Sequence, residues 1–138
     1  MAEKIIRINM TDLSTKVESV PVGWMGLGGR GLTSTVVAAE VKPTCHPLGK
    51  YNKLVIAPGL LSGTPAANSG RLSCGAKSPL TGTIKEANAG GTSAQMLAKL
   101  GVKALILEGK PADENKWYSI HVAAKGAAIK EETKVIGM

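Results

Sequence analysis

The distribution of glycine most constrains how this 138-residue chain can fold. Seventeen residues are glycine, and thirteen of these lie between Gly23 and Gly91. Glycine adopts backbone conformations that other residues avoid, and it lets other groups approach the backbone closely. Backbone geometry must therefore matter more than side-chain bulk in this stretch, and we look for a functional site there.

Composition indicates a single folded domain with few aromatic side chains. Hydrophobic residues make up 43% and charged residues 20%, as in globular chains. The length fits one domain and excludes a complete multidomain enzyme. With two Trp, two Tyr and no Phe, the core must consist of Val, Ile, Leu, Ala and Met.

The net charge of +7 favours an anionic partner. The charge is spread evenly, with about +3 in residues 1–58 and about +2 in each of residues 59–92 and 93–138. No basic run stands out, and few aromatic side chains are available to stack on bases. Nucleic acid is therefore not an expected partner.

Cysteine and histidine suggest no metal centre. Cys45 and Cys74 match no known ligand spacing, and His46 and His121 do not complete a ligand group with them. The N-terminus lacks the apolar stretch of a signal peptide, and no run approaches the ~20 apolar residues of a membrane span. We expect a cytoplasmic protein with no membrane partner.

Hydrophobic patterning predicts a strand-rich α+β single domain with two short helices. The first helix follows a glycine-rich turn and ends at Lys42–Pro43, and strands are expected over residues 3–9, 16–20, 53–57, 71–76, 103–108, 117–123 and 127–130. Residues 59–91 otherwise read as a long loop, and ordered loops of this length are usually functional.

The second helix is expected over residues 92–100. Thr92 or Ser93 would be its N-cap, and Gly101 would end it. The residues predicted to form its apolar face are Met96, Leu97 and Leu100.

Three features between residues 62 and 92 point to a phosphorylated ligand. Arg71 ends a loop of small residues, where its guanidinium can reach an anion. Lys77 begins the turn sequence KSPLTG. Asn88 and the Gly90–Gly91 pair precede a helix N-terminus, where free backbone N–H groups and the helix dipole favour phosphate.

Each feature also has a purely structural interpretation. Glycine pairs before helices often form ordinary turns, Arg71 could pair with a surface carboxylate, and Lys77 could be solvated. The chain contains neither the Walker pattern GxxxxGK[ST] nor a GxGxxG after a strand. No nucleophile–base pair can be identified, so no catalytic residue is assigned.

Several motifs in order resemble the N-terminal domain of the tungsten-dependent aldehyde ferredoxin oxidoreductases. The resemblance covers essentially the whole chain and rests on GGRGL (28–32), KLVIAPGLLSGTPA (53–66), SGR (69–71), KSPLTG (77–82), ANAGG (87–91) and GVKALILEGKP (101–111). In combination these motifs are specific, although each alone is weak.

The resemblance implies a cofactor site. In this family the first domain is an α+β base for a tungsten ion held by two pterin dithiolenes of the molybdopterin type, with a magnesium ion between the pterin phosphates. By resemblance, Arg71 contacts cofactor phosphate, and the backbone carbonyl of Asn88 holds the magnesium. Gly90 and Gly91 would let the backbone approach the pterin.

The chain also departs from the family pattern. It stops at Met138, before the family's second phosphate-binding arginine region, and it lacks the iron-sulfur cysteines of the later domains. We therefore expect residues 1–138 to be a partial cofactor-binding domain, without an iron-sulfur cluster and inactive alone. It would be either a piece of a larger enzyme or a short homologue.

Within the family's enzyme, the expected reaction is oxidation of an aldehyde to a carboxylic acid with electron transfer to ferredoxin. The partners would be the remaining domains, ferredoxin through the full enzyme and, in an oligomer, further copies of the chain. The alternative is a non-enzymatic module that binds a phosphorylated ligand or an acidic protein.

Overall fold

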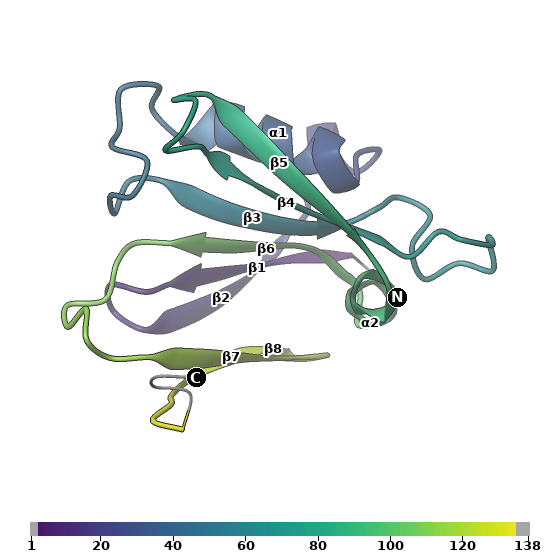
Figure 1. Ribbon diagram of the computed structural model, residues 1–138. Coiled ribbons are helices and arrows are strands. Elements are labelled where there is room, and N and C mark those ends of the chain that lie inside the picture. The colour runs from purple at the N-terminus through teal and green to yellow at the C-terminus, as the bar shows by residue number, and fades with distance from the viewer. Residues whose placement is uncertain (1–2, 135–138) are drawn as a thin grey trace.

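The computed structural model describes residues 3–134, so both ends of the expected 1–138 domain lie outside the described residues. Its elements are β1 (Lys4–Asn9), β2 (Ser14–Ser19), a 3-10 turn η1 (Val22–Trp24), α1 (Gly29–Glu40), β3 (Lys53–Pro58), β4 (Arg71–Lys77), β5 (Ile84–Gly90), α2 (Thr92–Lys99), β6 (Val102–Glu108), β7 (Tyr118–Ala123) and β8 (Gly126–Glu131) (Figure 1). The predicted strand-rich α+β class with two helices is confirmed.

Six strands form one sheet in the order β2-β1-β6-β3-β4-β5. The neighbours β1 and β6 are parallel, and all other neighbours in this sheet are antiparallel. The remaining strands, β7 and β8, form a separate antiparallel hairpin. One sheet therefore joins segments that lie far apart in the sequence.

Helix α1 covers one face of the sheet, where it lies against β3, β4 and β5 (Figure 1). Its buried residues Leu32, Val36 and Val37 recur at helical spacing. They pack against strand residues that include Ile5, Val55, Ala57, Ala104 and Ile106. This apolar layer fixes the height of α1 above the strands.

The β7–β8 hairpin covers the opposite face of β1 and β6. Ile6, Ile8, Val102 and Leu105 are buried beneath it. Alternate hairpin residues and α2 residues complete this second core, namely Ile120, Val122, Ala127, Ile129, Leu97 and Leu100. The buried apolar residues in the described part of the chain are Ile, Val, Leu and Ala, without the methionine that composition had suggested.

Strand β5 corrects the expectation of a long loop over residues 59–91. Residues 84–90 form a strand at the edge of the sheet, and all but Glu86 among them are exposed. An edge strand with one partner needs no alternating apolar pattern, so the sequence IKEANAG gave no strand signal. The expected strand over residues 71–76 is confirmed as β4.

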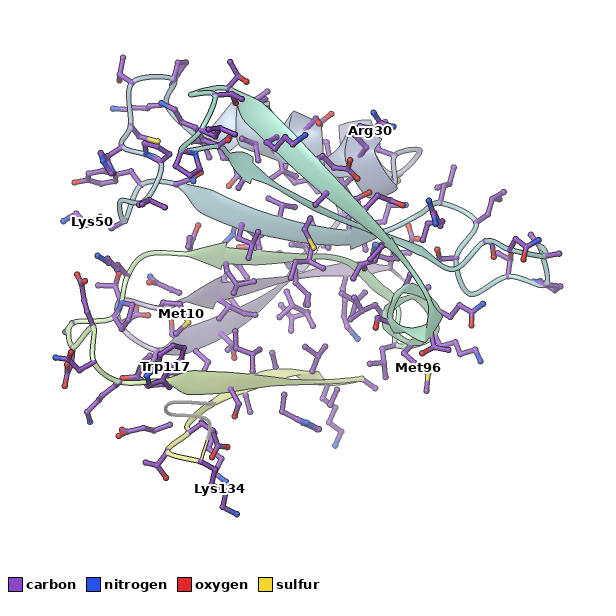
Figure 2. All side chains as sticks on the ribbon, in the orientation of Figure 1. Met10, Arg30, Lys50, Met96, Trp117 and Lys134 are labelled. Atoms are coloured by element: carbon purple, nitrogen blue, oxygen red, sulfur yellow. The ribbon has the colours of Figure 1, made fainter. Side chains whose placement is uncertain are left out.

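Helix α2 also differs in detail from expectation. Its N-cap is Gly91 rather than Thr92 or Ser93, and no side chain caps it. Ala94 is its buried residue, whereas Met96 is 60% exposed and projects outward (Figure 2). Gly101 has a φ of +71°, which agrees with its predicted role as the helix stop.

No helix in residues 3–134 is both long and apolar enough to cross a membrane.

Candidate functional site

Pairing of β4 with β5 brings the predicted site residues together. Arg71 lies opposite Gly90, and Ser73 lies opposite Asn88. Directly paired residues of antiparallel strands share a face of the sheet, as do residues two apart in one strand. Arg71, Ser73 and Asn88 therefore belong to the face on which α1 packs.

The Arg71 side chain lies over Gly90. A Cβ atom added to Gly90 would be 3.1 Å from Nη1 of Arg71, which is tighter than ordinary van der Waals contact. Arg71 is exposed, and its guanidinium has no ion pair or hydrogen bond within residues 3–134. The glycine thus leaves room for a guanidinium that is free to bind an anion.

The Asn88 side chain is held by a buried serine. Asn88 Nδ2 donates a hydrogen bond of 3.1 Å to Oγ of Ser73, which is 1% exposed. A Cβ added to Gly29 would lie 3.4 Å from the same Oγ, so the start of α1 adjoins this contact. Sequence analysis did not single out Ser73; its position two residues after Arg71 in a strand was the available signal.

Gly91 links β5 to α2 with a φ of +134°, a conformation that favours glycine. Its N–H donates a hydrogen bond of 3.0 Å to the Gly70 carbonyl. A Cβ added to Gly70 would lie only 2.5 Å from the Gly91 carbonyl oxygen, whereas a Cβ added to Gly91 would meet nothing within 4 Å. The two loop ends are therefore packed together, with open space above Gly91.

The N-terminus of α1 adds to this region. Gly28 is its N-cap, without a side-chain hydrogen bond, and the first turn contains no acidic residue. Gly28 must be glycine because a Cβ there would lie 2.5 Å from the backbone nitrogen of Leu60. The first glycine of the motif GGRGL is thus explained by close packing of the loop after β3 on the loop before α1.

Two buried polar atoms near these residues have no hydrogen-bond partner among residues 3–134, namely Oγ of Ser69 and Oε1 of Glu86. Glu86 lies two residues before Asn88 on the same face, and its other oxygen is 4.0 Å from Nε of Arg30. Buried polar atoms are normally satisfied, so such exceptions call for a physical explanation.

Lys77 does not join the site, contrary to the expected convergence of three features. It lies at the other end of β4 from Arg71. Its ammonium donates hydrogen bonds to the carbonyls of Pro43 and Cys45 and so anchors the loop after α1.

The cysteines and histidines form no metal centre within residues 3–134, where no three His, Cys, Asp or Glu side chains cluster suitably. Burial raises the pKa of the Cys74 thiol, and the nearby Glu86 carboxylate raises it further. Cys74 alternates with Ser73 in β4 and therefore faces away from Arg71. What the site presents is an exposed guanidinium beside exposed backbone, and guanidinium groups are suited to bind oxyanions.

Comparisons with known proteins match this chain to one family. Residues 5–138 match the family model described as aldehyde ferredoxin oxidoreductase, N-terminal domain. A tungsten-containing aldehyde ferredoxin oxidoreductase of Pyrococcus furiosus is 41% identical over 109 residues, or 78% of this chain and 18% of the relative. The enzyme of the same name from Pyrococcus abyssi is 38% identical over 138 residues, or 97% of this chain and 22% of the relative.

A solved structure also has this fold. The active site complex BamBC of benzoyl coenzyme A reductase, in complex with 1,5 dienoyl-CoA, superposes with a TM-score of 0.85 at 25% identity. The match covers 93% of this chain and 19% of the other chain. This chain thus spans about a fifth of the length of the relatives it matches. It belongs to the aldehyde ferredoxin oxidoreductase family, within that family's N-terminal domain.

Proposed function

We propose that this chain is part of the cofactor-binding base of a tungsten enzyme that oxidises aldehydes to carboxylic acids. The main supporting observation is the Arg71 guanidinium, which lies over Gly90 at the edge of the sheet and has no ion pair in the described part of the chain. An arginine without a protein carboxylate partner, held beside open backbone, suits an anionic group such as a pterin phosphate.

The residues present fit such a cofactor. Arg71 would bind phosphate, the Asn88 backbone carbonyl would hold the magnesium ion, and Gly90 and Gly91 would border the pterin. The open space above Gly91 and the unpartnered hydroxyl of Ser69 support this assignment. When bound, a tungsten bis-pterin cofactor supplies two-electron redox chemistry; this chain's own residues bind and orient it.

The assignment of aldehyde oxidation, rather than another reaction, rests on the relatives. Those with 41% and 38% identity are named tungsten-containing aldehyde ferredoxin oxidoreductases, whereas the benzoyl coenzyme A reductase chain is 25% identical. Since the matches span about a fifth of each relative, we assign the iron-sulfur cluster, the contact with ferredoxin and the rest of the pocket to other domains. Residues 1–138 alone would then be inactive.

Replacing Arg71 tests this proposal. In an enzyme that carries this chain as its N-terminal domain, Arg71→Ala should weaken cofactor retention about tenfold or more, because a charge-assisted hydrogen bond contributes roughly 1.5–3 kcal/mol. Tungsten and pterin per protein would be measured after extended dialysis. Lys85→Ala is the matched control, since Lys85 pairs with Ala76 on the other face.

Full tungsten and pterin content in Arg71→Ala would overturn the assignment of Arg71. Loss of tungsten and pterin from both variants would instead indicate that any positive charge on these strands helps to retain the cofactor. Unchanged thermal unfolding of the apoprotein is expected for both variants, because neither side chain is buried.

A further inference from the structure

A second candidate binding site lies at the opposite end of the sheet from Arg71. It is a cavity of about 950 Å³ at the carboxyl ends of the parallel strands β1 and β6, bordered by the segment between α1 and β3. Figure 2 shows Lys50 of this segment at the left edge of the molecule, away from Arg30, the second residue of α1. The volume suits an organic ligand rather than a single ion.

The floor of this cavity is a fixed network of charges. Lys53 Nζ lies 2.7 Å from Oε2 of Glu40 and 2.6 Å from Oε2 of Glu108. Arg7 bridges the same two carboxylates at 2.8 and 3.1 Å. Both carboxylates are thus compensated, and Oε1 of Glu108 remains without a hydrogen bond in the described part of the chain.

The rim carries positive charge that the protein does not neutralise. Lys42 and Lys50 line the cavity and form no ion pair within residues 3–134. The Lys50 ammonium lies 5.2 Å from the centre of the Tyr51 ring, which also lines the cavity. His46 Nδ1 accepts the Leu48 N–H at 3.2 Å, so the neutral ring carries its proton on Nε2 and can donate.

The segment that carries this rim is anchored at several points. Lys77 Nζ donates to the carbonyls of Pro43 and Cys45. Asn52 Nδ2 donates to the carbonyls of Pro47, at 2.6 Å, and Lys77, at 2.9 Å. The wall is therefore held by β4, and less conformational entropy is lost when a ligand binds to it.

We propose that this cavity binds a small organic phosphate of nucleotide size. Lys42, Lys50 and the His46 Nε2–H would hold the phosphate group, because they donate and the two lysines bring uncompensated charge. Glu108 Oε1 would accept from ligand hydroxyl groups at the floor. Such a ligand carries a charged phosphate at one end and hydroxyl groups at the other, so it can contact the lysines of the rim and Glu108 of the floor at once. Inorganic phosphate is too small to contact both.

The test is titration of the 138-residue chain with adenosine 5′-monophosphate, followed by amide chemical shifts and by calorimetry. We expect shifts at residues 42–53 and 108–109, and weaker binding of inorganic phosphate at the same residues. A double variant, Lys42→Gln with Lys50→Gln, should weaken nucleotide binding at least tenfold. The matched control is Lys125→Gln with Lys130→Gln on the hairpin, which removes equal charge elsewhere and should bind normally.

Four outcomes would overturn the proposal. The nucleotide could cause no shifts at millimolar concentration, both double variants could lose affinity equally, or the shifts could be confined to residues near Arg71. Binding that survives Arg71→Ala is expected, because this site is independent of the proposed cofactor base. If citrate binds more tightly than the nucleotide, the site prefers carboxylates and the phosphate assignment is wrong.

Discussion

At the scale of residues, the adjacent glycines 90 and 91 serve different purposes. Gly90 is in β5, where its missing side chain leaves room for the Arg71 guanidinium. Gly91 is the N-cap of α2, with a φ of +134° and open space around its Cα. The sequence predicted the importance of the pair but could not separate their functions, since that requires knowing that Gly90 lies opposite Arg71.

Alanine at each position should separate these functions. Gly90→Ala places a methyl group 3.1 Å from Nη1 of Arg71, so the guanidinium must shift; pyrophosphate affinity of the chain should fall severalfold with little change in unfolding temperature. Gly91→Ala meets no atom but strains the backbone, which costs about 1–3 kcal/mol of stability. Calorimetry and urea unfolding measure the two effects. Unaltered pyrophosphate affinity in Gly90→Ala would argue against Arg71 as the anion ligand.

At the scale of elements, the spacing of apolar residues predicted the helices and strands whose own residues alternate or recur between buried and exposed positions. The first hairpin, α1, β3, β6 and the last hairpin all have the expected type, because Ile, Val and Leu alternate or recur there at the matching period. Strand β5 was missed because its exposed residues carry no such pattern. Met96 was assigned to the wrong face because small Ala94 makes the buried contact of α2.

The contact between α1 and β4 gives a second prediction. A Cβ at Gly75 would lie 2.7 Å from the side chain of buried Thr33, so Gly75→Ala should push α1 off the sheet and destabilise the fold by about 1–3 kcal/mol. Gly31→Ala in α1 is the control: its Cβ has space, and alanine should stabilise the helix by about 1 kcal/mol. Denaturant unfolding of both variants measures this, and equal stability of the two would refute the packing argument.

The charge network between α1 and the strands predicts sensitivity to acid. Burial alone would raise the pKa of Glu40, but hydrogen bonds and charges from Arg7 and Lys53 outweigh it and hold the pKa below its ordinary value of 4.5. A carboxylate with a lowered pKa stabilises the fold above its unfolded-state pKa and loses that contribution as pH falls through the folded-state value. Stability should therefore decline below about pH 4.5.

Glu40→Gln should lower stability at pH 7 by about 1–3 kcal/mol and flatten this acid decline. Thermal unfolding across pH 3–7 measures both effects. Glu114→Gln is the control, because exposed Glu114 pairs with exposed Lys110, and such a surface pair contributes little to stability. If the stability of Glu40→Gln falls as steeply with decreasing pH as that of the parent chain, other carboxylates cause the loss of stability in acid.

At the scale of the whole molecule, helix α1 and the last hairpin can cover the two faces of the sheet only because strands far apart in the sequence pair with each other. Sequence patterns do not specify which strands pair. The parallel β1–β6 pair joins residues about a hundred positions apart, and it puts Ile6 and Ile8 beneath the last hairpin. Helix α1 and the hairpin then lie on opposite faces of one sheet (Figure 1). Loop composition and helix-terminus chemistry pointed to Arg71, Asn88, Gly90 and Gly91 as ligands of a phosphorylated group, and the family resemblance assigned them to a cofactor.

Removing the hairpin should expose one entire core. A chain ending after Lys110 would uncover Ile6, Ile8 and Leu105, each at most 7% exposed in the intact fold. It should bind hydrophobic dyes and lose cooperative unfolding, because uncovered apolar surface no longer contributes to stability. His121→Ala, on the exposed side of β7, should leave both properties intact. A shortened chain that melts cooperatively would mean that the hairpin contributes little.

The position of β5 at the sheet edge has a consequence for how occupancy can be observed. Amide hydrogens of a strand with one partner and exposed side chains exchange with solvent through local opening, long before those of the central strands β1 and β6. A ligand held between Arg71 and Gly91 would have to suppress that opening. Deuterium uptake by residues 84–91 would then report binding from an edge strand of the sheet.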